Sequence, residues 1–527
     1  MFMKRTTIYI LAFLFATLQT FAQSTVNYEY DANNRLKKVT YSSGAMVTYT
    51  YDELGNRLSK KVVGSAPNPN IHFYDQKVKA ICVEHWDTSG DGELSYDEAA
   101  AVTDLGEAFK DYDDILSFNE LQYFTGLTAI GEYAFSGCLS LASVMIPDGI
   151  TTIGGDAFSN CYALKTITLP DGLKSIGADA FFYCWRLAEI ELPDGLETIG
   201  NSAFENCSFT SLHIPSSVSS IGGYLLRSCN NLVSITVDPA NETYDSRDNC
   251  NAIIETATKT LVAGCKNTVM PDDLKAIGDG AFCGDMLYDS TLTIPESVTS
   301  IGDQAFAHNY RIKDFVFPAG LEYVGCDAFY YTGWFNKQPD GMVYINNNIA
   351  YKYKGSVLEN SSVELDEGTK MISPYLFDYY VGRNVTSISI PKSVKVIGHN
   401  AFDYCYNMIS VTVYAKIPPT LDSRYRIFPS NMNNMTLYVP YGTKAIYENT
   451  TEWKRFKNIV EMEPLPYIVG DTNGDGEVTI SDAVAIVNYI LGNPSQSFNF
   501  NAADVNNDGE VTISDAVGVV NMIVIDN

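Results

Sequence analysis

The chain has 527 residues, enough for several domains with cores of their own. Asp and Glu outnumber Lys and Arg by 63 to 35, which gives a net charge of −28. A surface this acidic repels nucleic acid and anionic membranes, so we exclude both as partners. The same charge fits a soluble extracellular protein that uses calcium, although colloidal solubility alone also explains it.

The first 22 residues have the layout of a secretory signal. Lys4 and Arg5 precede an apolar run over residues 8–15, and Ala22 precedes the expected cleavage point. No later apolar stretch is long enough to span a bilayer. We therefore expect a secreted or cell-surface chain with residues 1–22 removed and no membrane span after signal cleavage. An uncleaved N-terminal anchor is the alternative.

Residues 23–63 contain a Tyr-Asp phrase twice. Tyr30-Asp31 is followed 21 residues later by Tyr51-Asp52, and Tyr and Val alternate with polar residues around both. This alternation predicts exposed β strands. The phrase resembles the Tyr-Asp repeat of RHS type, whose families use many copies to form a shell. Two copies predict only a small β unit, with a poorly ordered arm as the alternative because isolated hairpins are marginal in water.

Residues 64–120 are expected to form an N-terminal cap. A linker rich in Pro and Asn over residues 64–71 leads to a predicted helix over Val78–Trp86. The twelve residues 87–98 then place oxygen side chains at positions 1, 3, 5, 9 and 12 and Gly at position 6, the EF-hand spacing that wraps a calcium ion. An acidic turn without metal is the alternative. The predicted ligands are Asp87, Ser89, Asp91, Glu93, Ser95 and Glu98.

A 23-residue repeat fills most of the chain. The phrase Ile-Gly-x-x-Ala-Phe-x-x-Cys begins at Ile130, Ile153, Ile176 and Ile199, and fainter copies begin at Ile277, Ile301, Val324 and Ile397. Between copies lies a strand-like phrase, Leu-x-x-Ile-x-Leu-Pro. A fixed period of this length with Leu and Ile at alternating positions is typical of a leucine-rich-repeat solenoid.

The repeat predicts how the coils pack. One coil cannot bury its own Ile, Leu and Phe side chains, but stacked coils can, with the strand-like phrases paired about 4.8 Å apart in a parallel sheet. The expected internal ladder consists of Phe135, Phe158, Phe181 and Phe204, and it ends at Leu226. The repeat also predicts solvated turn carboxylates at Asp148, Asp156, Asp171, Asp179 and Asp194.

The wording of the repeat resembles the BspA-like leucine-rich repeats of bacterial surface and secreted proteins, over residues 67–463. The resemblance implies a leucine-rich-repeat solenoid (α/β, short parallel strands) with small EF-hand-like α modules at both ends. We place the solenoid and its C-terminal cap at residues 121–463. Residues 238–270 and 331–370 interrupt the repeat and should form longer coils or hairpins.

Cys138, Cys161, Cys184 and Cys207 share one position of the repeat. Stacking would bring their Cα atoms near disulfide range, so bridging stays open. A position that recurs and points inward is most simply a small buried hydrophobe, and we predict free thiols.

Residues 464–527 carry the calcium-loop pattern twice, 33 positions apart. Each loop runs into an apolar helix, predicted over Ala483–Leu491 and Ala516–Val524. The predicted ligands are Asp471, Asn473, Asp475, Glu477, Thr479 and Asp482 in the first loop, and Asp504, Asn506, Asp508, Glu510, Thr512 and Asp515 in the second.

The tandem loops resemble the type I dockerin, a calcium-folded module that docks onto a cohesin domain of another protein. Asp at position 12 of both loops is a further point of resemblance. The resemblance implies that loop positions 10 and 11, which are Ile480-Ser481 and Ile513-Ser514, contact the cohesin. Because the two pairs are identical, either half could face the partner.

Two functions follow from this organisation. The first is a non-catalytic binding or adhesion protein, whose solenoid holds a host or neighbouring-cell protein or glycan and whose dockerin joins a cohesin-bearing scaffold. The second is a component or enzyme of polysaccharide degradation, because dockerins commonly ride on glycoside hydrolases. That reaction needs two carboxylates held across a cleft. The five His residues have no metal or triad spacing, and we favour the non-catalytic protein with no catalytic residues.

Overall fold

The computed structural model describes residues 27–33, 35–40, 46–51, 57–63, 70–287, 290–422, 424–462 and 467–525. The predicted signal at 1–22, Asp52 and most of the linker before residue 70 lie outside the described residues. The chain divides into two compact units. Unit 1 comprises Met1–Gly320 and Ala328–Lys337, and unit 2 comprises Leu321–Asp327 and Gln338–Asn527.

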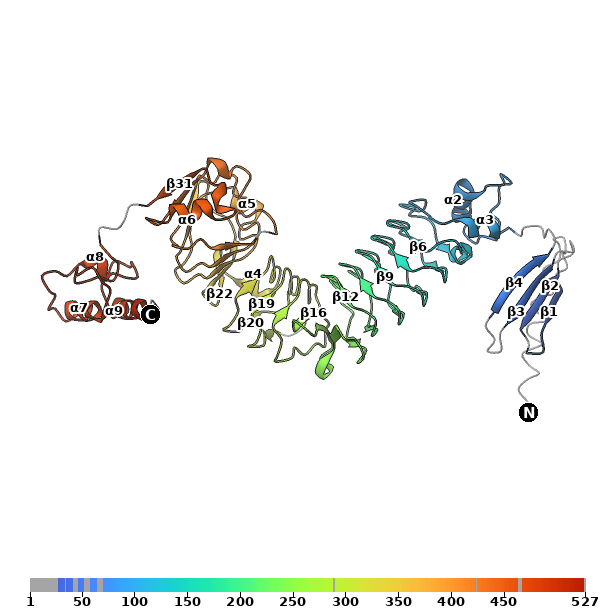
Figure 1. The fold of residues 1–527 in the computed structure, drawn as a ribbon, viewed down its shortest axis with the longest axis horizontal. Helices are drawn as coiled ribbons and strands as arrows, with labels where there is room; N and C mark the ends of the chain where they lie inside the picture. The colour runs from blue at the N-terminus through green and yellow to red at the C-terminus, as the bar shows by residue number, and fades with distance from the viewer. Residues whose placement is uncertain are drawn as a thin grey trace. The chain divides into compact units, whose positions relative to one another are not determined.

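The Tyr-Asp segment of unit 1 is a four-stranded antiparallel sheet, which confirms the predicted β unit (Figure 1). Its strands are β1 (Asn27–Tyr30), β2 (Leu36–Thr40), β3 (Met46–Tyr51) and β4 (Arg57–Val63). In the first copy of the phrase, the Asp31 carboxylate accepts the backbone N–H groups of Asn33 and Arg35 and pairs with the Arg35 guanidinium at 2.7 Å. The Arg35 side chain in turn lies 4.8 Å from the Tyr51 ring.

The N-terminal cap consists of two short helices, α2 (Gln76–Trp86) and α3 (Tyr96–Ala101). The predicted helix over Val78–Trp86 is therefore confirmed, and it begins two residues earlier, where the Asp75 side chain caps the N–H groups of Lys77 and Val78. The Trp86 ring packs against Phe109 and Phe124, which belong to the first coils. The cap therefore closes the apolar end of the stack.

The coils of unit 1 stack through short parallel strands (Figure 1). These strands are β6 (Ala129–Ile130), β8 (Thr152–Ile153), β9 (Ser175–Ile176), β10 (Thr198–Ile199) and β12 (Ser220–Ile221). They pair residue for residue, Ile153 with Ile176 for example. Gly after each Ile permits this contact, because a Cβ at Gly177 would lie 2.5 Å from the Gly155 nitrogen.

The Leu-x-x-Ile-x-Leu phrase, where the sequence predicts the parallel sheet, pairs continuously in unit 2, over Val385–Ile390, Ser410–Val413 and Thr436–Val439. In unit 1 the phrase pairs only in part. There the structure has β5 (Ser117–Phe118) with β7 (Ser143–Val144), β11 (Ser211–Ile214) with β13 (Ser234–Val237), and single bridges at Thr166 and Thr168. A groove of about 400 Å³ is lined by the phrases around Thr166, Glu189 and Ser211. The coils approach most closely at the glycines, so the continuous ladder forms there instead.

The predicted phenylalanine ladder is confirmed. Phe135, Phe158, Phe181 and Phe204 are fully buried, with ring centroids of successive members 5.2, 5.4 and 5.8 Å apart and planes within 18° of parallel. The next position is the buried Leu226, as expected. The turn carboxylates are a partial correction: Asp156 and Asp179 are half-buried and adopt φ of 52° and 55°, so only Asp148, Asp171 and Asp194 are exposed.

Both interruptions of the repeat contain β hairpins. In unit 1, β15 (Ala252–Glu255) and β16 (Thr260–Gly264) pair, and β14 (Tyr244–Asp245) lies beside them. A Cβ at Gly264 would lie 2.1 Å from Cε1 of Phe282, so the glycine leaves room for that ring. The coils after it contribute β17 (Ala276–Ile277), β18 (Thr291–Thr293), β19 (Ser300–Ile301), β20 (Asp314–Val316) and α4 (Gly333–Lys337).

Unit 2 contains two sheets of mainly parallel strands. One has β22 (Gly341–Ile345), β23 (Ile349–Lys354), β25 (Met371–Ile372), β27 (Val396–Ile397) and β29 (Thr420–Leu421), of which β22 and β23 form the second hairpin. The other has β24 (Ser361–Glu364), β26 (Val385–Ile390), β28 (Ser410–Val413), β30 (Thr436–Val439) and β31 (Asn458–Glu461). The unit also includes β21 (Tyr323–Val324), α5 (Tyr379–Gly382) and α6 (Lys444–Asn449).

The predicted C-terminal cap forms at the end of these sheets. Trp453 is fully buried and its indole N–H donates to the carbonyl of Pro419 at 3.0 Å. Tyr447 on α6, which the sequence did not predict, donates its hydroxyl to the Ala415 carbonyl at 2.7 Å. These two hydrogen bonds satisfy buried polar groups of the last coil and hold the cap in place.

None of the eleven cysteines, all of which lie in the described ranges, forms a disulfide, in agreement with the predicted thiols. Their role differs from that of a plain hydrophobe, because each ladder thiol lies within 3.0–3.4 Å of the carbonyl oxygen of the Phe one coil earlier. The thiols that donate in this way are Cys138, Cys161, Cys184, Cys207 and Cys229. Asn309 stands at the same repeat position, and its Nδ2 donates to the Phe282 carbonyl at 2.6 Å. In these six coils the position therefore supplies a hydrogen-bond donor between coils.

We expect the native thiols to resist alkylation and disulfide exchange. Burial raises the pKa of Cys138 and Cys229 to about 12, and the thiolate is the reactive species. At pH 8 the native protein should give at most one fast Ellman-reactive thiol, that of Cys326, the one cysteine that is not fully buried. All eleven should react in guanidinium. Fewer than eleven in guanidinium without reductant would indicate disulfides.

Candidate calcium loops and docking surface

The C-terminal residues form a small three-helix module. Its helices are α7 (Ile480–Ile490), α8 (Phe500–Ala503) and α9 (Ile513–Ile525). The two predicted helices are confirmed, and each begins three residues earlier than expected, inside its loop. The buried core between them is small and consists of Ala483, Ile486, Ala503, Ala516 and Val519, with partly buried side chains such as Phe498 packed against it.

Position 1 of each loop is fixed by backbone N–H groups. Asp471 Oδ2 accepts the N–H of Gly476 at 2.9 Å, and Oδ1 accepts those of Gly474 and Asp475. Asp504 is held in the same way, with Oδ2 accepting the N–H of Gly509 at 2.9 Å. The Gly at position 6 has φ of 92° in the first loop and 85° in the second, a conformation that L side chains rarely adopt.

Position 12 is a buried carboxylate in both loops. Asp482 and Asp515 have no exposed surface. Asp482 Oδ1 accepts the N–H groups of Thr472 and Asn473 at 2.8 and 3.1 Å, and Oδ2 accepts that of Thr479 at 2.9 Å. Asp515 accepts from Val505, Asn506 and Thr512 in the matching geometry. Each oxygen thus keeps a fixed orientation toward the loop.

The charge of the loops fits a divalent cation. None of the ion pairs found among the described residues involves a carboxylate of either C-terminal loop, so Asp482 and Asp515 are buried without a protein cation. Across the described part of the chain, no three His, Cys, Asp or Glu side chains converge as a preformed metal cluster. The donor set that the loops offer is mixed, with carboxylate, amide and hydroxyl oxygens, which are the oxygen ligands that calcium takes.

Two predicted ligands differ from the rest. The side chains of Glu477 and Glu510, at position 7, are exposed. In calcium loops of this spacing, position 7 contributes its backbone carbonyl oxygen. If these residues bind calcium, they therefore do so through the main chain.

The loop at residues 87–98 has the same hydrogen-bond framework. Asp87 Oδ2 accepts the N–H of Gly92 at 2.9 Å, and Glu98 accepts the N–H groups of positions 2, 3 and 9 at 2.9–3.0 Å. Hydrogen bonds, that from the backbone N–H of Ser95 first, lower the pKa of Glu98 to about 2. The position-7 side chain, Glu93, pairs instead with Lys79 on α2 at 2.5 Å.

The first turns of α7 and α9 present matching apolar side chains to solvent. Ile480 and Ile513 are 63 % and 64 % exposed, and one helical turn later Val484 and Val517 are 52 % and 53 % exposed. Sequence reasoning named the isoleucines but missed the valines, although the i, i+4 spacing from each Ile could have identified them. Each half of the module therefore carries an equivalent apolar patch, which we call the Ile-Val patch.

The two serines of the predicted docking pairs take part in the loops. Ser481 Oγ lies 2.6 Å from Thr479 Oγ and 3.2 Å from Asn473 Nδ2. Ser514 makes the same contacts with Thr512 and Asn506. The serines thus connect the loop side chains to the surface that carries the Ile-Val patch.

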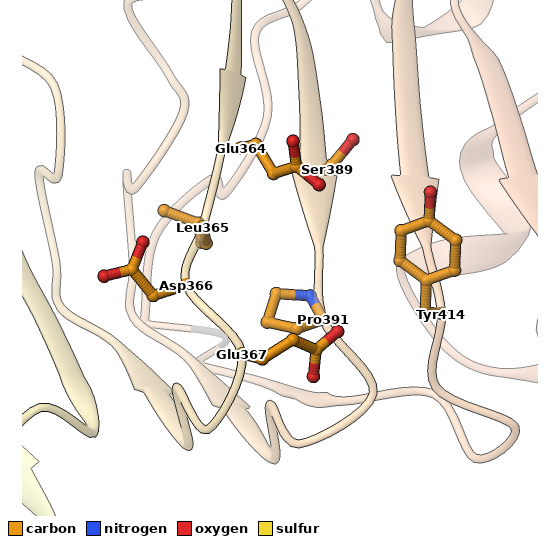
Figure 2. Close-up of a pocket in the computed structure, with 7 residues that line it drawn as sticks. All are labelled: Glu364, Leu365, Asp366, Glu367, Ser389, Pro391 and Tyr414. Carbon is orange, nitrogen blue, oxygen red and sulfur yellow. The ribbon is translucent and has the colours of Figure 1, made fainter. Parts of the chain in front are cut away.

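A shallow pocket of about 300 Å³ lies on the strand face of unit 2. Figure 2 shows Glu364 of β24 beside Ser389 of β26, and the ring of Tyr414, the residue that follows β28, lies farther along the same face. Asp366, Glu367, Leu365 and Pro391 complete its wall. The pocket is acidic and polar, in keeping with the mostly half-buried Ser and Thr positions along these strands.

The fold is that of a leucine-rich-repeat solenoid, because its coils stack through short parallel strands and turn their Phe and Leu side chains inward. The family model of the BspA type leucine rich repeat region matches in six copies, at residues 107–247, 253–353 and 369–465. The chain belongs to this family. A dockerin type I domain matches residues 469–524, and an RHS repeat matches residues 30–64.

Several solved structures are similar to this chain. A leucine rich cell surface protein of Faecalibacterium prausnitzii is 20 % identical, over 74 % of this chain and 95 % of its own, with a TM-score of 0.38. The pneumococcal vaccine antigen PcpA is 17 % identical, over 84 % and 100 %, with a TM-score of 0.42. A leucine-rich repeat protein of Bacteroides ovatus is 18 % identical, over 85 % and 100 %, with a TM-score of 0.29. No curated protein matches the chain.

These assignments set the class of the protein. BspA-type repeats and dockerins are typical of extracellular or cell-surface proteins and are typically non-catalytic. Type I dockerins generally bind calcium and dock to a cohesin. None of the helices in the described residues is both long enough and apolar enough to traverse a bilayer.

Proposed function

We propose that this chain is a secreted, non-catalytic binding protein that is held on a scaffold. In this proposal, the solenoid binds a host or neighbouring-cell protein or glycan, and the dockerin attaches the chain to a cohesin-bearing partner. The observation that carries it is the pair of matched loops, each followed by an exposed Ile-Val patch. The division into signal, Tyr-Asp unit, cap, solenoid and dockerin, with bounds at residues 22, 63, 120 and 463, belongs to the same proposal.

The two C-terminal loops are proposed as calcium sites. Side-chain oxygens at positions 1, 3, 5 and 12 and the carbonyl oxygen at position 7 would hold the ion, with Thr479 and Thr512 at position 9 reaching it directly or through water. The support is the pair of buried position-12 carboxylates, which have N–H donors but no protein cation. Bound calcium would supply the positive charge that these carboxylates lack.

The loop at residues 87–98 is proposed as a third calcium site. Its framework of N–H donors matches those of the C-terminal loops, and its position 12 is Glu98, long enough to bind calcium through both oxygens. It joins α2 to α3, whose buried residues belong to the same core as the first coils. Calcium here would brace the N-terminal cap.

The Ile-Val patch is proposed as the cohesin-docking surface, together with Ser481 and Ser514. Apolar residues that stay exposed at matching positions of two helices point to a partner. Because the two patches have almost equal exposed fractions, either half can present the same contact after a half-turn of the module.

The test is capture of a cohesin-containing protein by the immobilised full chain. We expect capture in calcium and none in chelator. Changing Ile480 and Ser481 to Asp, or Ile513 and Ser514 to Asp, should leave capture nearly intact, because the other half remains. Changing all four should abolish it.

Both serines contact the calcium loops, so their substitution could weaken calcium binding as well as the docking surface. Calcium titration of each variant distinguishes these two causes of lost capture. A second variant with only Ile480→Asp and Ile513→Asp leaves the serines in place. Loss of capture in either single-half variant would rule out two-way docking. Full capture by the four-residue variant would rule out this surface.

A further inference from the structure

A pair of stacked aromatic rings lies at the surface of unit 1, on the turns that directly follow Cys161 and Cys184. Trp185 is 52 % exposed, and its ring stacks on that of Tyr162 with centroids 4.8 Å apart and planes 8° from parallel. Tyr183 lies beside the indole, with 5.7 Å between centroids. The other three tryptophans are buried or half-buried, so an exposed indole is particular to this coil.

The stack is open at one end. Tyr162 and Trp185 occupy the same position of consecutive coils, directly after the ladder cysteines. In the next coil this position is Ser208, whose Oγ donates to the Trp185 carbonyl at 2.5 Å. Over the described ranges, Trp185 contacts the rings of Tyr162 and Tyr183 alone. The indole face toward Ser208 therefore has no aromatic neighbour.

Amide and hydroxyl groups flank the rings. Asn160, Tyr183 and Asn206 share the position just before the ladder cysteine in the same three coils. Tyr162 Oη donates to Asn160 Oδ1 at 3.3 Å, and Asn206 Nδ2 donates to Glu205 Oε1 at 3.4 Å. An apolar ring face thus adjoins several uncharged hydrogen-bonding groups.

We propose that Tyr162, Tyr183 and Trp185, here called the aromatic platform, bind pyranose rings of an uncharged glycan. The face of an aromatic ring has negative potential and attracts the positively polarised C–H groups on one face of a sugar. The amides and hydroxyls at the rim can bond to the sugar hydroxyls. This proposal rests on the binding function proposed above and names its ligand class.

Two observations favour a neutral glycan over other ligands. The net charge of −28 disfavours acidic glycans. A stable protein interface takes about 800 Å² per partner around an apolar centre. This platform is flanked by the polar Asn160, Asn206 and Ser208 and by a single exposed Leu, Leu139, at the repeat position of Tyr162 in the preceding coil.

Exposed aromatics recur in later coils of unit 1. Tyr310 is 54 % exposed at the repeat position of Trp185, and Tyr331 is 50 % exposed at that of Tyr183. Aromatic positions that repeat along a solenoid suit a polymer, because successive sugars can use successive contacts.

The test is native affinity electrophoresis of the full chain in gels containing xyloglucan, galactomannan, mixed-linkage β-glucan or polygalacturonate. We expect at least one neutral polysaccharide to retard the wild type and polygalacturonate not to. Trp185→Ala should weaken the apparent affinity about tenfold, the size of one lost stacking contact. Trp185→Phe should retain part of it. The matched control is Tyr74→Ala, which removes an aromatic ring that is 79 % exposed in the cap and should have no effect.

The outcomes separate this proposal from the docking function. Unfolding midpoints establish that each variant is folded, and capture of the cohesin should be the same for Trp185→Ala as for wild type. Equal retardation of Trp185→Ala and wild type overturns the platform while leaving docking intact. Retardation by polygalacturonate alone, or by none of the polysaccharides, overturns the neutral-glycan ligand.

Discussion

Chelation of calcium should unfold the C-terminal module and leave the solenoid folded. The module buries few apolar side chains, so its folding free energy depends on the bound ion. Without calcium, the buried carboxylates of Asp482 and Asp515 would lack a compensating charge. The stacked coils have a continuous apolar core of their own. Calorimetry of the full chain should therefore show one transition lost in EDTA and the others nearly unchanged.

A double variant distinguishes the loss of calcium from the C-terminal loops from any other effect of EDTA on the chain. Asp471→Ala with Asp504→Ala should give the chelated thermogram even in calcium, because both position-1 ligands are gone. The cap loop should respond less, since Phe73, Ile81 and Leu94 around it are buried in the solenoid core. Full occupancy should correspond to three calcium ions per chain. Loss of every transition in EDTA, or no change in any, would contradict the prediction.

Truncating one ring of the phenylalanine ladder should destabilise unit 1 strongly. Phe181 is fully buried and stacks between Phe158 and Phe204. Phe181→Ala should lower the free energy of unfolding by about 3–5 kcal/mol, because it leaves a cavity that the stacked backbone cannot close. Chemical denaturation followed by circular dichroism measures the shift in midpoint.

The matched control comes from the same coil. Asp171 is exposed in the Pro-Asp-Gly turn, and Asp171→Ala should change stability by no more than about 0.5 kcal/mol. Asp179 is a poorer control, because its φ of 55° strains an alanine there. Equal midpoint shifts for Phe181→Ala and Asp171→Ala would mean that the repeat positions assigned to the buried face of the coil are wrong.

The sequence predicted the features that repeat. Phe135, Phe158 and Phe181 recur at one phase, and this periodicity alone indicates that they face inward and stack. The calcium-type loops were equally clear, because their ligand types, spacing and glycine are set by the geometry of one turn. The helices after them followed from the apolar residues, although they begin inside the loops, at Ile480 and Ile513.

The features that the sequence did not predict depend on contacts between coils. In unit 1 a continuous sheet forms beside Gly177 and its equivalents, because those glycines allow the coils to approach closely, which strand propensity does not report. The thiol of Cys184 donates to a carbonyl 26 residues earlier, a contact that a local pattern cannot reveal. Asp179 looked like an ordinary turn residue, but its backbone lies in the left-handed region. In each case the deciding neighbour lies one coil away.

The thiol-to-carbonyl contact lets the solenoid change length by whole coils. Every ladder coil brings one donor, at the cysteine, and one acceptor, at the Phe carbonyl. A duplication or loss of 23 residues therefore regenerates the same joint wherever it falls, and no new interface has to arise for the solenoid to change length. Asn309 supplies the same joint with an amide donor. Thr332, at this position one coil later, donates instead to the Phe329 carbonyl of its own coil, so the joint between coils belongs to the Cys and Asn positions.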